Sequence, residues 1–210
     1  MRIVVVGDVL LDRDVSGSAD RLSPDAPVPV VAVRETRRRA GGAGLVATLL
    51  ARDGVDVDLV TALGDDDRAE ELRSLLENGA GRGTIDVLAS ASHLPTPVKT
   101  RVRGAGHPLL RLDEGCDPVP GPPASTDEQL RALERADAVV VADYGRGVTA
   151  DPRLRAALES AGRRVPLVWD PHPKGARPVA SSAGVFEARR QARLGSLTTR
   201  SVVDRLEVTP

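Results

Sequence analysis

Cysteine is nearly absent from this chain of 210 residues, and its apolar runs are short. Because Cys116 stands alone, no disulfide can form within the chain, and a reducing compartment, the cytoplasm, is the expected location. The cysteine and histidine residues show no metal-ligand spacing, which excludes a structural zinc site. The apolar run near the N-terminus covers only residues 3–6, too short for a signal-peptide core, and no run approaches the ~18 apolar residues of a membrane span.

Aromatic residues and lysine are also scarce, and neither sign of charge is in large excess. The aromatic residues are Tyr144, Trp169 and Phe186, so the core must be aliphatic, and base-stacking platforms for single-stranded nucleic acid are excluded. The formal net charge of −1, from 29 basic and 30 acidic side chains, gives no electrostatic reason to expect nucleic acid or an anionic membrane as a partner. Lys99 and Lys174 are the only lysines. A lysine kept where arginine supplies nearly every other cation is a candidate functional residue, although chance explains two isolated lysines equally well.

Alternating strand and helix patterns predict an α/β fold with a mostly parallel sheet flanked by helices. Strands are expected at residues 3–7, 58–63, 138–142 and 166–169, and helices at 42–53, 66–78, 125–136 and 152–162. The first helix is expected to turn Leu45 and Leu50 inward, and a capping box at 125–128 to open the third.

A smaller lid is expected from segments 12–34 and 97–113. Residues 27–33 carry prolines at their start, as an edge strand does, and residues 97–113 read as a hairpin. From 179 to 210 the apolar periodicity is lost. Residues 1–178 are therefore expected to form one domain, and residues 179–210 a poorly packed tail.

Acidic side chains stand where the predicted strands end. Asp8, Asp65, Asp143 and Asp170 occupy such positions, and ligands of open parallel sheets bind beyond the carboxyl ends of the strands. Asp65 precedes a helix and is interpreted as a helix cap. Asp8, with Asp12 four residues later, is interpreted as a ligand of hydroxyl groups, because carboxylates accept several hydrogen bonds and suit a vicinal diol.

A glycine cluster at residues 41–44 opens the first predicted helix. It lacks the Lys-Ser/Thr of a Walker A loop, and the first strand carries only Gly7 instead of the spaced glycines of a nicotinamide-binding fold. Glycines at a helix N-terminus let backbone N–H groups approach a ligand oxygen. A tight turn without a ligand is the alternative.

Cations gather on two other segments. Lys99, Arg101 and Arg103 alternate along a predicted strand and share one face of it, and Arg111 lies on the partner strand. This face either meets a phosphate or is a solvated strand face. Lys174 lies in a proline-stiffened loop after the last predicted strand, which suits the approach of a phosphate or is a plain connection.

These pieces, in this order, resemble the ribokinase-like (PfkB) carbohydrate kinases over about residues 1–178. The matching motifs are Gly-Asp-Val-Leu-Leu-Asp at 7–12, Gly-Gly-Ala at 41–43, Gly-Asp-Asp at 64–66 and Asp-Tyr-Gly-Arg-Gly at 143–147. The most specific segment is Arg-Leu-Ser-Pro-Asp-Ala-Pro-Val-Pro-Val at 21–30. It is similar to the signature of D-glycero-β-D-manno-heptose 7-phosphate kinases, as are Thr-x-x-Lys-x-Arg at 96–101 and Arg-Leu-Asp at 111–113.

The resemblance implies a Rossmann-type parallel α/β sheet with a small β lid. It implies transfer of the γ-phosphate of ATP, with Mg²⁺, to the anomeric hydroxyl of D-glycero-D-manno-heptose 7-phosphate in ADP-heptose biosynthesis, or to another sugar. Substrate contacts are then expected from Asp8, Asp12, Gly41, Gly42 and Asp143. Phosphate contacts are expected from Lys99, Arg101, Arg111, Asp170 and Lys174. A homodimer formed through the lid is a further expectation.

Two departures from the family pattern affect these expectations. Leu45 stands where the family usually has asparagine, which puts one sugar contact in doubt. The Gly-Ala-Gly-Asp motif, which supplies an anion hole and the catalytic base in the family, is absent from the sequence. The chain is therefore expected to be truncated before the catalytic half, with most of the nucleotide site outside it, and to be inactive alone. A non-catalytic sugar-phosphate-binding module or a gene remnant is the alternative.

Overall fold

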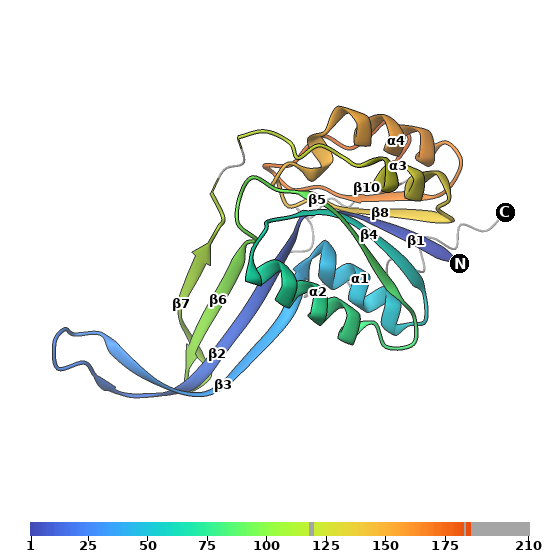
Figure 1. Ribbon diagram of the computed structural model, residues 1–210. Helices are drawn as coiled ribbons and strands as arrows, with labels where there is room; N and C mark the ends of the chain where they lie inside the picture. The colour runs from blue at the N-terminus through green and yellow to red at the C-terminus, as the bar shows by residue number, and fades with distance from the viewer. Residues whose placement is uncertain (118–119, 183, 186–210) are drawn as a thin grey trace.

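The structure, a computed structural model, describes residues 1–117, 120–182 and 184–185 (Figure 1). Most of the predicted tail at 179–210 lies outside the described residues. Val179 is described, and it packs in the hydrophobic core. Among the described residues, no helix is long and apolar enough to cross a membrane.

The central sheet of the described residues has six parallel strands in the order β10-β9-β8-β1-β4-β5. The strands are β1 (Arg2–Gly7), β4 (Asp56–Leu63), β5 (Ile85–Ala91), β8 (Ala138–Ala142), β9 (Leu167–Asp170) and β10 (Gly184–Val185). The predicted parallel α/β fold is therefore confirmed. The sequence reading missed β5, an edge strand with small and polar residues among its apolar ones, and β10.

Helices cover both faces of this sheet. The helices α1 (Ala43–Arg52) and α2 (Asp67–Gly79) lie on one face, and α3 (Asp127–Glu134) and α4 (Pro152–Gly162) lie on the other (Figure 1). Successive side chains of a strand point to opposite faces. Ile3 and Val5 of β1 accordingly join the core beneath α1 and α2, while Val4 and Val6 join the core beneath α3 and α4. This explains why β1 is a continuous apolar run.

The helix ends and faces differ in detail from the prediction. Leu45 is exposed, because α1 packs with its small residues, such as Ala43 and Ala47, close against the sheet. The side chain of Asp66, rather than that of Asp65, caps α2 by accepting a hydrogen bond from the backbone N–H of Ala69 at 2.8 Å.

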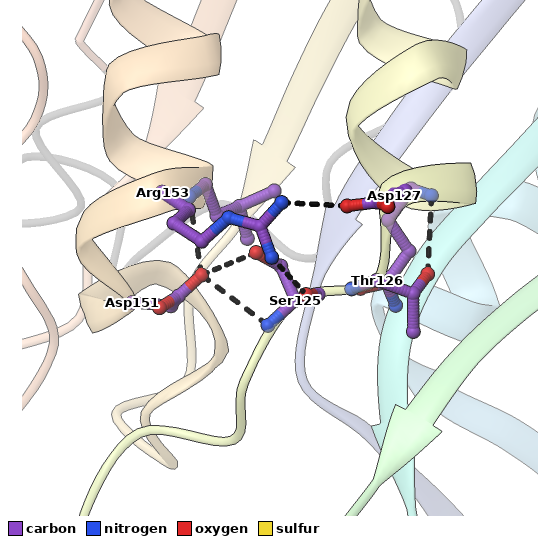
Figure 2. Close-up of polar contacts among 7 residues, drawn as sticks. Ser125, Thr126, Asp127, Asp151 and Arg153 are labelled. Atoms are coloured by element: carbon purple, nitrogen blue, oxygen red, sulfur yellow. Dashed lines mark hydrogen bonds and ion pairs between the residues drawn. The ribbon is translucent and has the colours of Figure 1, made fainter.

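The capping box of α3 begins one residue later than predicted, at Thr126 with Gln129 as its partner. Ser125 instead joins the cap of α4, where Asp151 accepts hydrogen bonds from the backbone N–H of Ser125 at 3.3 Å and from its hydroxyl (Figure 2). Arg153 donates to the carbonyl of Ser125 at 3.3 Å and to the carboxylate of Asp127 at 2.6 Å. These contacts join the N-terminal ends of α3 and α4.

A second sheet, the lid, extends away from this body (Figure 1). Its four strands are β2 (Val9–Leu22), β3 (Pro29–Gly42), β6 (Val98–Gly104) and β7 (His107–Glu114), in the order β3-β2-β6-β7. The predicted hairpin of β6 and β7 is present. The sequence reading missed β2, which pairs with β6 only as far as Gly17. Beyond that point, residues 20–31 form an arm whose strands pair only with each other.

Candidate functional site

Three of the predicted acidic residues meet at the carboxyl edge of the central sheet. Asp8 follows β1, Asp143 follows β8 and Asp170 ends β9, on three neighbouring strands. Asp8 and Asp143 are buried, with 3% and 2% of their surface exposed, whereas Asp170 is half-buried. Asp65, which follows β4, is exposed.

The carboxylate of Asp8 accepts hydrogen bonds from backbone N–H groups of the loop after β8. Its Oδ2 accepts from Tyr144 at 2.9 Å and from Arg146 at 3.0 Å, and its Oδ1 accepts from Val148 at 3.4 Å. Burial raises the pKa of Asp8, and these hydrogen bonds offset part of that rise. That Asp8 also binds a ligand hydroxyl stays a prediction.

Asp143 holds the same loop and the loop after β9. It accepts hydrogen bonds from the N–H of Gly145 at 2.8 Å, the hydroxyl of Thr149 at 2.7 Å and the N–H of Ala176 at 2.9 Å. A Cβ atom at Gly175 would lie 2.5 Å from this carboxylate, so only glycine fits there. The two buried aspartates therefore fix the shape of both loops, and a direct ligand contact of Asp143 stays a prediction.

Asp12 and Arg101 lie on one face of the lid and form an ion pair. The guanidinium of Arg101 donates to Oδ1 of Asp12 at 2.5 Å, and Arg39 lies 3.7 Å from Oδ2. Asp12 raises the pKa of Arg101 through this hydrogen bond. A Cβ atom at Gly41 would lie 2.8 Å from Oδ2 of Asp12, so glycine leaves room for this carboxylate.

An open cleft of about 840 Å³ separates the lid from the loops at the sheet edge. Lys99 of β6 and Arg111 of β7 line its lid wall, and Lys174 lines its other wall. The only two lysines of the chain thus face one cavity from opposite sides, although 75 positions separate them. Arg111 also pairs with Asp113 of the same strand at 2.8 Å.

The sequence reading missed three further residues of this cleft, Tyr144, Arg146 and His172. The rings of Tyr144 and His172 are stacked, with centroids 6.2 Å apart and planes at 29°. Arg146 donates from Nη2 to the carbonyl of Gly115 at 2.8 Å and so links the loop after β8 to the end of the lid. The motif at 143–147 pointed to this loop, but nothing in it distinguished these side chains from a turn.

A magnesium site is not assigned. In the part of the chain that the structure describes, no group of three or more acidic, histidine or cysteine side chains is arranged to hold a metal ion. Mg²⁺ is usually held by one or two carboxylates together with substrate phosphates and waters, so its use by this chain stays a prediction.

The N-terminal part of the chain matches a family of carbohydrate kinases. Residues 1–80 match the model of the pfkB family of carbohydrate kinases. The resemblance predicted from the motifs is therefore confirmed. These 80 residues contain β1, the whole β2–β3 hairpin of the lid, α1, the strand β4 and α2.

Curated relatives match a longer part of the chain. The bifunctional protein HldE of Streptomyces coelicolor is 46% identical over 190 residues, which are 90% of this chain and 38% of that protein. The bifunctional protein HldE of Hyphomonas neptunium is 37% identical over 177 residues, 81% of this chain and 35% of that protein. The chain thus spans less than half the length of these relatives.

Solved structures share the fold. Arabidopsis thaliana ribokinase, complexed with ribose and ATP, aligns with a TM-score of 0.57 and 18% identity over 80% of this chain and 53% of that chain. A carbohydrate kinase from Agrobacterium tumefaciens aligns with a TM-score of 0.56 and 17% identity, over 81% of this chain and 53% of that chain. At these identities the similarity shows the fold alone, and the predicted ribokinase-like fold is confirmed.

Proposed function

We propose that this chain forms the sugar-phosphate-binding part of a carbohydrate kinase, with D-glycero-D-manno-heptose 7-phosphate as its ligand and ATP as the phosphate donor. The observation that carries the proposal is the meeting of Lys99 and Lys174 in one cleft. The family match and the curated relatives support the kinase class. The segments at 21–30, 96–101 and 111–113 favour the heptose phosphate over another sugar.

The cleft offers positive charge on both walls. Lys99 and Arg111 from the lid, and Arg146 and Lys174 from the loops, would hold the phosphate of the ligand by charge-assisted hydrogen bonds. The carboxylate of Asp12, beside Gly41, would accept hydrogen bonds from sugar hydroxyls. Binding therefore needs groups of both sheets, and the lid closes over the ligand rather than forming the whole site.

We infer that the chain alone transfers no phosphate. A sugar hydroxyl is a poor nucleophile without a positioned base, and the transferred phosphoryl group needs fixed donors around its oxygens. The sequence lacks the Gly-Ala-Gly-Asp motif that supplies both in the family. A non-catalytic sugar-phosphate-binding module is the second candidate, favoured by this same feature. ATP-dependent turnover of heptose 7-phosphate by the chain alone would contradict this inference.

We also propose that the protein is cytoplasmic and that two copies associate through the lid. The single cysteine supports a reducing compartment. The arm at residues 20–31 supports association, because a two-stranded hairpin without a third strand is marginally stable in water. Leu22 and Val28 of the arm are 61% and 51% exposed, and a second copy of the same lid would cover them.

The ligand can be tested by competition with chemical modification of amines. With two lysines in the chain, an amine-reactive acylating reagent has three sites, the third being the α-amino group of Met1, which is 75% exposed. Saturating heptose 7-phosphate is expected to slow acylation of both Lys99 and Lys174, measured by peptide mass spectrometry, and to leave Met1 unchanged as the internal control.

The same experiment separates the alternatives. Unchanged acylation of both lysines at saturating ligand would overturn the proposed function. Equal protection by inorganic phosphate at the same concentration would overturn the sugar assignment and leave a general phosphate site. Protection of one lysine alone would contradict the two-walled cleft.

A further inference from the structure

We propose that Tyr144 is a ligand-contact residue of the cleft, whose ring forms with His172 a stacking platform for the carbon–hydrogen face of the bound sugar phosphate. This inference rests on the proposed function for the class of ligand. It assigns Asp8 and Asp143 a positioning role, because their carboxylates hold the backbone on either side of Tyr144.

The backbone of Tyr144 is fixed by two buried charges. Its N–H donates to Asp8 at 2.9 Å, and the N–H of the next residue, Gly145, donates to Asp143 at 2.8 Å. Hydrogen bonds to charged groups are stronger than those between neutral groups. Gly145 has a φ of 75°, and a Cβ atom there would lie 2.9 Å from the backbone carbon of Lys174, so the turn closely contacts the loop after β9.

The ring of Tyr144 presents apolar surface to a cleft that charged side chains also line. Tyr144 is 38% exposed, whereas Trp169, the aromatic residue of β9, is fully buried in the core. One edge of the Tyr144 ring lies beside Gly42, where a Cβ atom would be 3.6 Å from Cδ2. The stacked ring of His172 supports it. Aromatic rings pack well against the carbon–hydrogen faces of sugars, which need an apolar surface among their polar contacts.

The surroundings of Tyr144 disfavour ionisation of its phenol. Burial raises the pKa of Tyr144, and the charges of Asp170 and Asp12 raise it further. The hydroxyl is therefore protonated at neutral pH and able to donate a hydrogen bond. A residue with an apolar ring and a donor at its tip suits a ligand with alternating carbon–hydrogen and oxygen groups.

His172 connects the platform to the phosphate-binding cation. Its Nδ1 accepts a hydrogen bond from the backbone N–H of Lys174 at 3.2 Å, so the ring and Lys174 belong to one short turn. The sugar and its phosphate would thus be recognised by neighbouring groups of the same loop, with Lys99 closing from the lid.

The test compares two ligands on two variants of the full chain. Tyr144→Leu is expected to weaken binding of heptose 7-phosphate roughly tenfold by calorimetry, because the stacking surface is lost. Tyr144→Phe, which keeps the ring, is the matched control and is expected to stay within about threefold of the parent protein. Binding of inorganic phosphate is expected to be unchanged in both variants, a result that a merely structural role of Tyr144 would not give.

A second measurement on the unaltered protein guards against misfolding of the variants. Because the chain has one tyrosine, labelling its tyrosine ring with ¹³C gives NMR signals from Tyr144 alone, and heptose 7-phosphate is expected to shift those signals while inorganic phosphate does not. Equal loss of both ligands in Tyr144→Leu, or unshifted ring signals while Lys99 and Lys174 are protected from acylation, would overturn this inference and leave the proposed function standing. Unprotected lysines would overturn both.

Discussion

Asp8 and Asp12, four positions apart in one motif, have different surroundings. Asp8 accepts backbone hydrogen bonds in the interior, while Asp12 lies on the lid strand β2 and pairs with Arg101. The spacing along the chain did not predict this difference, because a long-range contact decides each partner. Replacing these two aspartates is therefore expected to have different consequences.

Asp12→Asn is expected to weaken binding of heptose 7-phosphate by about 1–3 kcal/mol, through lost charged hydrogen bonds to sugar hydroxyls. Asp14→Asn is the matched control, because Asp14 also lies on β2 and pairs with Arg39 at 2.9 Å. Calorimetry measures both. If Asp12 serves only to neutralise Arg101, the freed cation strengthens binding of the phosphate instead, and tighter binding by Asp12→Asn would contradict its role as a sugar ligand.

Gly175→Ala is expected to destabilise the protein by about 1–3 kcal/mol, because the new methyl group would overlap the carboxylate of Asp143. Moving that carboxylate breaks its hydrogen bonds to Gly145, Thr149 and Ala176. Gly121→Ala is the control, since a Cβ atom there meets no described atom within 4 Å. Denaturant unfolding measures the stability of both variants. Equal unfolding midpoints for the two variants would contradict this prediction and show that the two loops rearrange to accept the methyl group.

The helix α2 is tied to the lid by its cap. One oxygen of Asp66 accepts from Ala69 at 2.8 Å, and the other accepts from the N–H of Thr96, ahead of β6, at 2.7 Å. Burial raises the pKa of Asp66, but these hydrogen bonds outweigh it and hold the pKa below the usual 3.8. The ionised carboxylate therefore stabilises the folded state.

Asp66→Asn is expected to lower the free energy of unfolding by about 1 kcal/mol at neutral pH, because an amide has one acceptor oxygen and cannot accept from both Ala69 and Thr96. A lowered pKa means that this contribution is complete above pH 3.8 and is lost as the pH falls through the folded-state value. The difference in free energy of unfolding between the parent protein and Asp66→Asn should accordingly become smaller at acidic pH. Asp65→Asn, at the exposed neighbouring position, is the control, and a difference that stays constant with pH would contradict the electrostatic account.

Much of this architecture was predictable from the sequence, for identifiable reasons. The buried strands β1 and β8 are short apolar runs followed directly by Asp8 and Asp143, and Asp151-Pro152 marks the start of α4. The prediction of a helix cap was wrong where two candidate residues are adjacent, as at Asp65 and Asp66. Only the tertiary contact with Thr96 determines which of the two side chains caps the helix.

The polar strand β2 and the cleft were harder to predict. Alternating charges stabilise β2 through neighbours on β3 and β6, and these neighbours are distant in sequence. The lysines were singled out by scarcity, whereas their convergence on one cleft needed the fold. Tyr144 could not be distinguished from a turn residue, since its surroundings come from β1 and from the loop after β9.

The arm gives the molecule an unusual outline, because it extends beyond every other strand of the lid (Figure 1). Replacing residues 20–31 by a two-residue Asn-Gly turn is expected to leave the thermal midpoint nearly unchanged, since the arm's strands pair only with each other. The same change is expected to abolish dimer formation, measured by sedimentation velocity.

Point variants provide the control for this deletion. Leu22→Ser and Val28→Ser keep the arm and remove its exposed apolar side chains, and each is expected to weaken association partially. A shortened protein that still sediments as a dimer would contradict the arm's role, and a parent protein that is monomeric at all concentrations would overturn the proposed association.

Because β1 lies in the middle of the central sheet, one of its two neighbouring strands is synthesised much later than β1 itself. Its neighbour β4 is made early, but its other neighbour, β8, leaves the ribosome 135 residues later than β1. At about 5–20 residues per second, this interval is roughly 7–27 s. Throughout it, the Val4–Val5–Val6 segment has one unpaired strand edge, which can pair with another nascent chain. The speed of translation between residues 63 and 138 should therefore influence the yield of native protein. Chaperones would protect the unpaired edge of β1 during this interval.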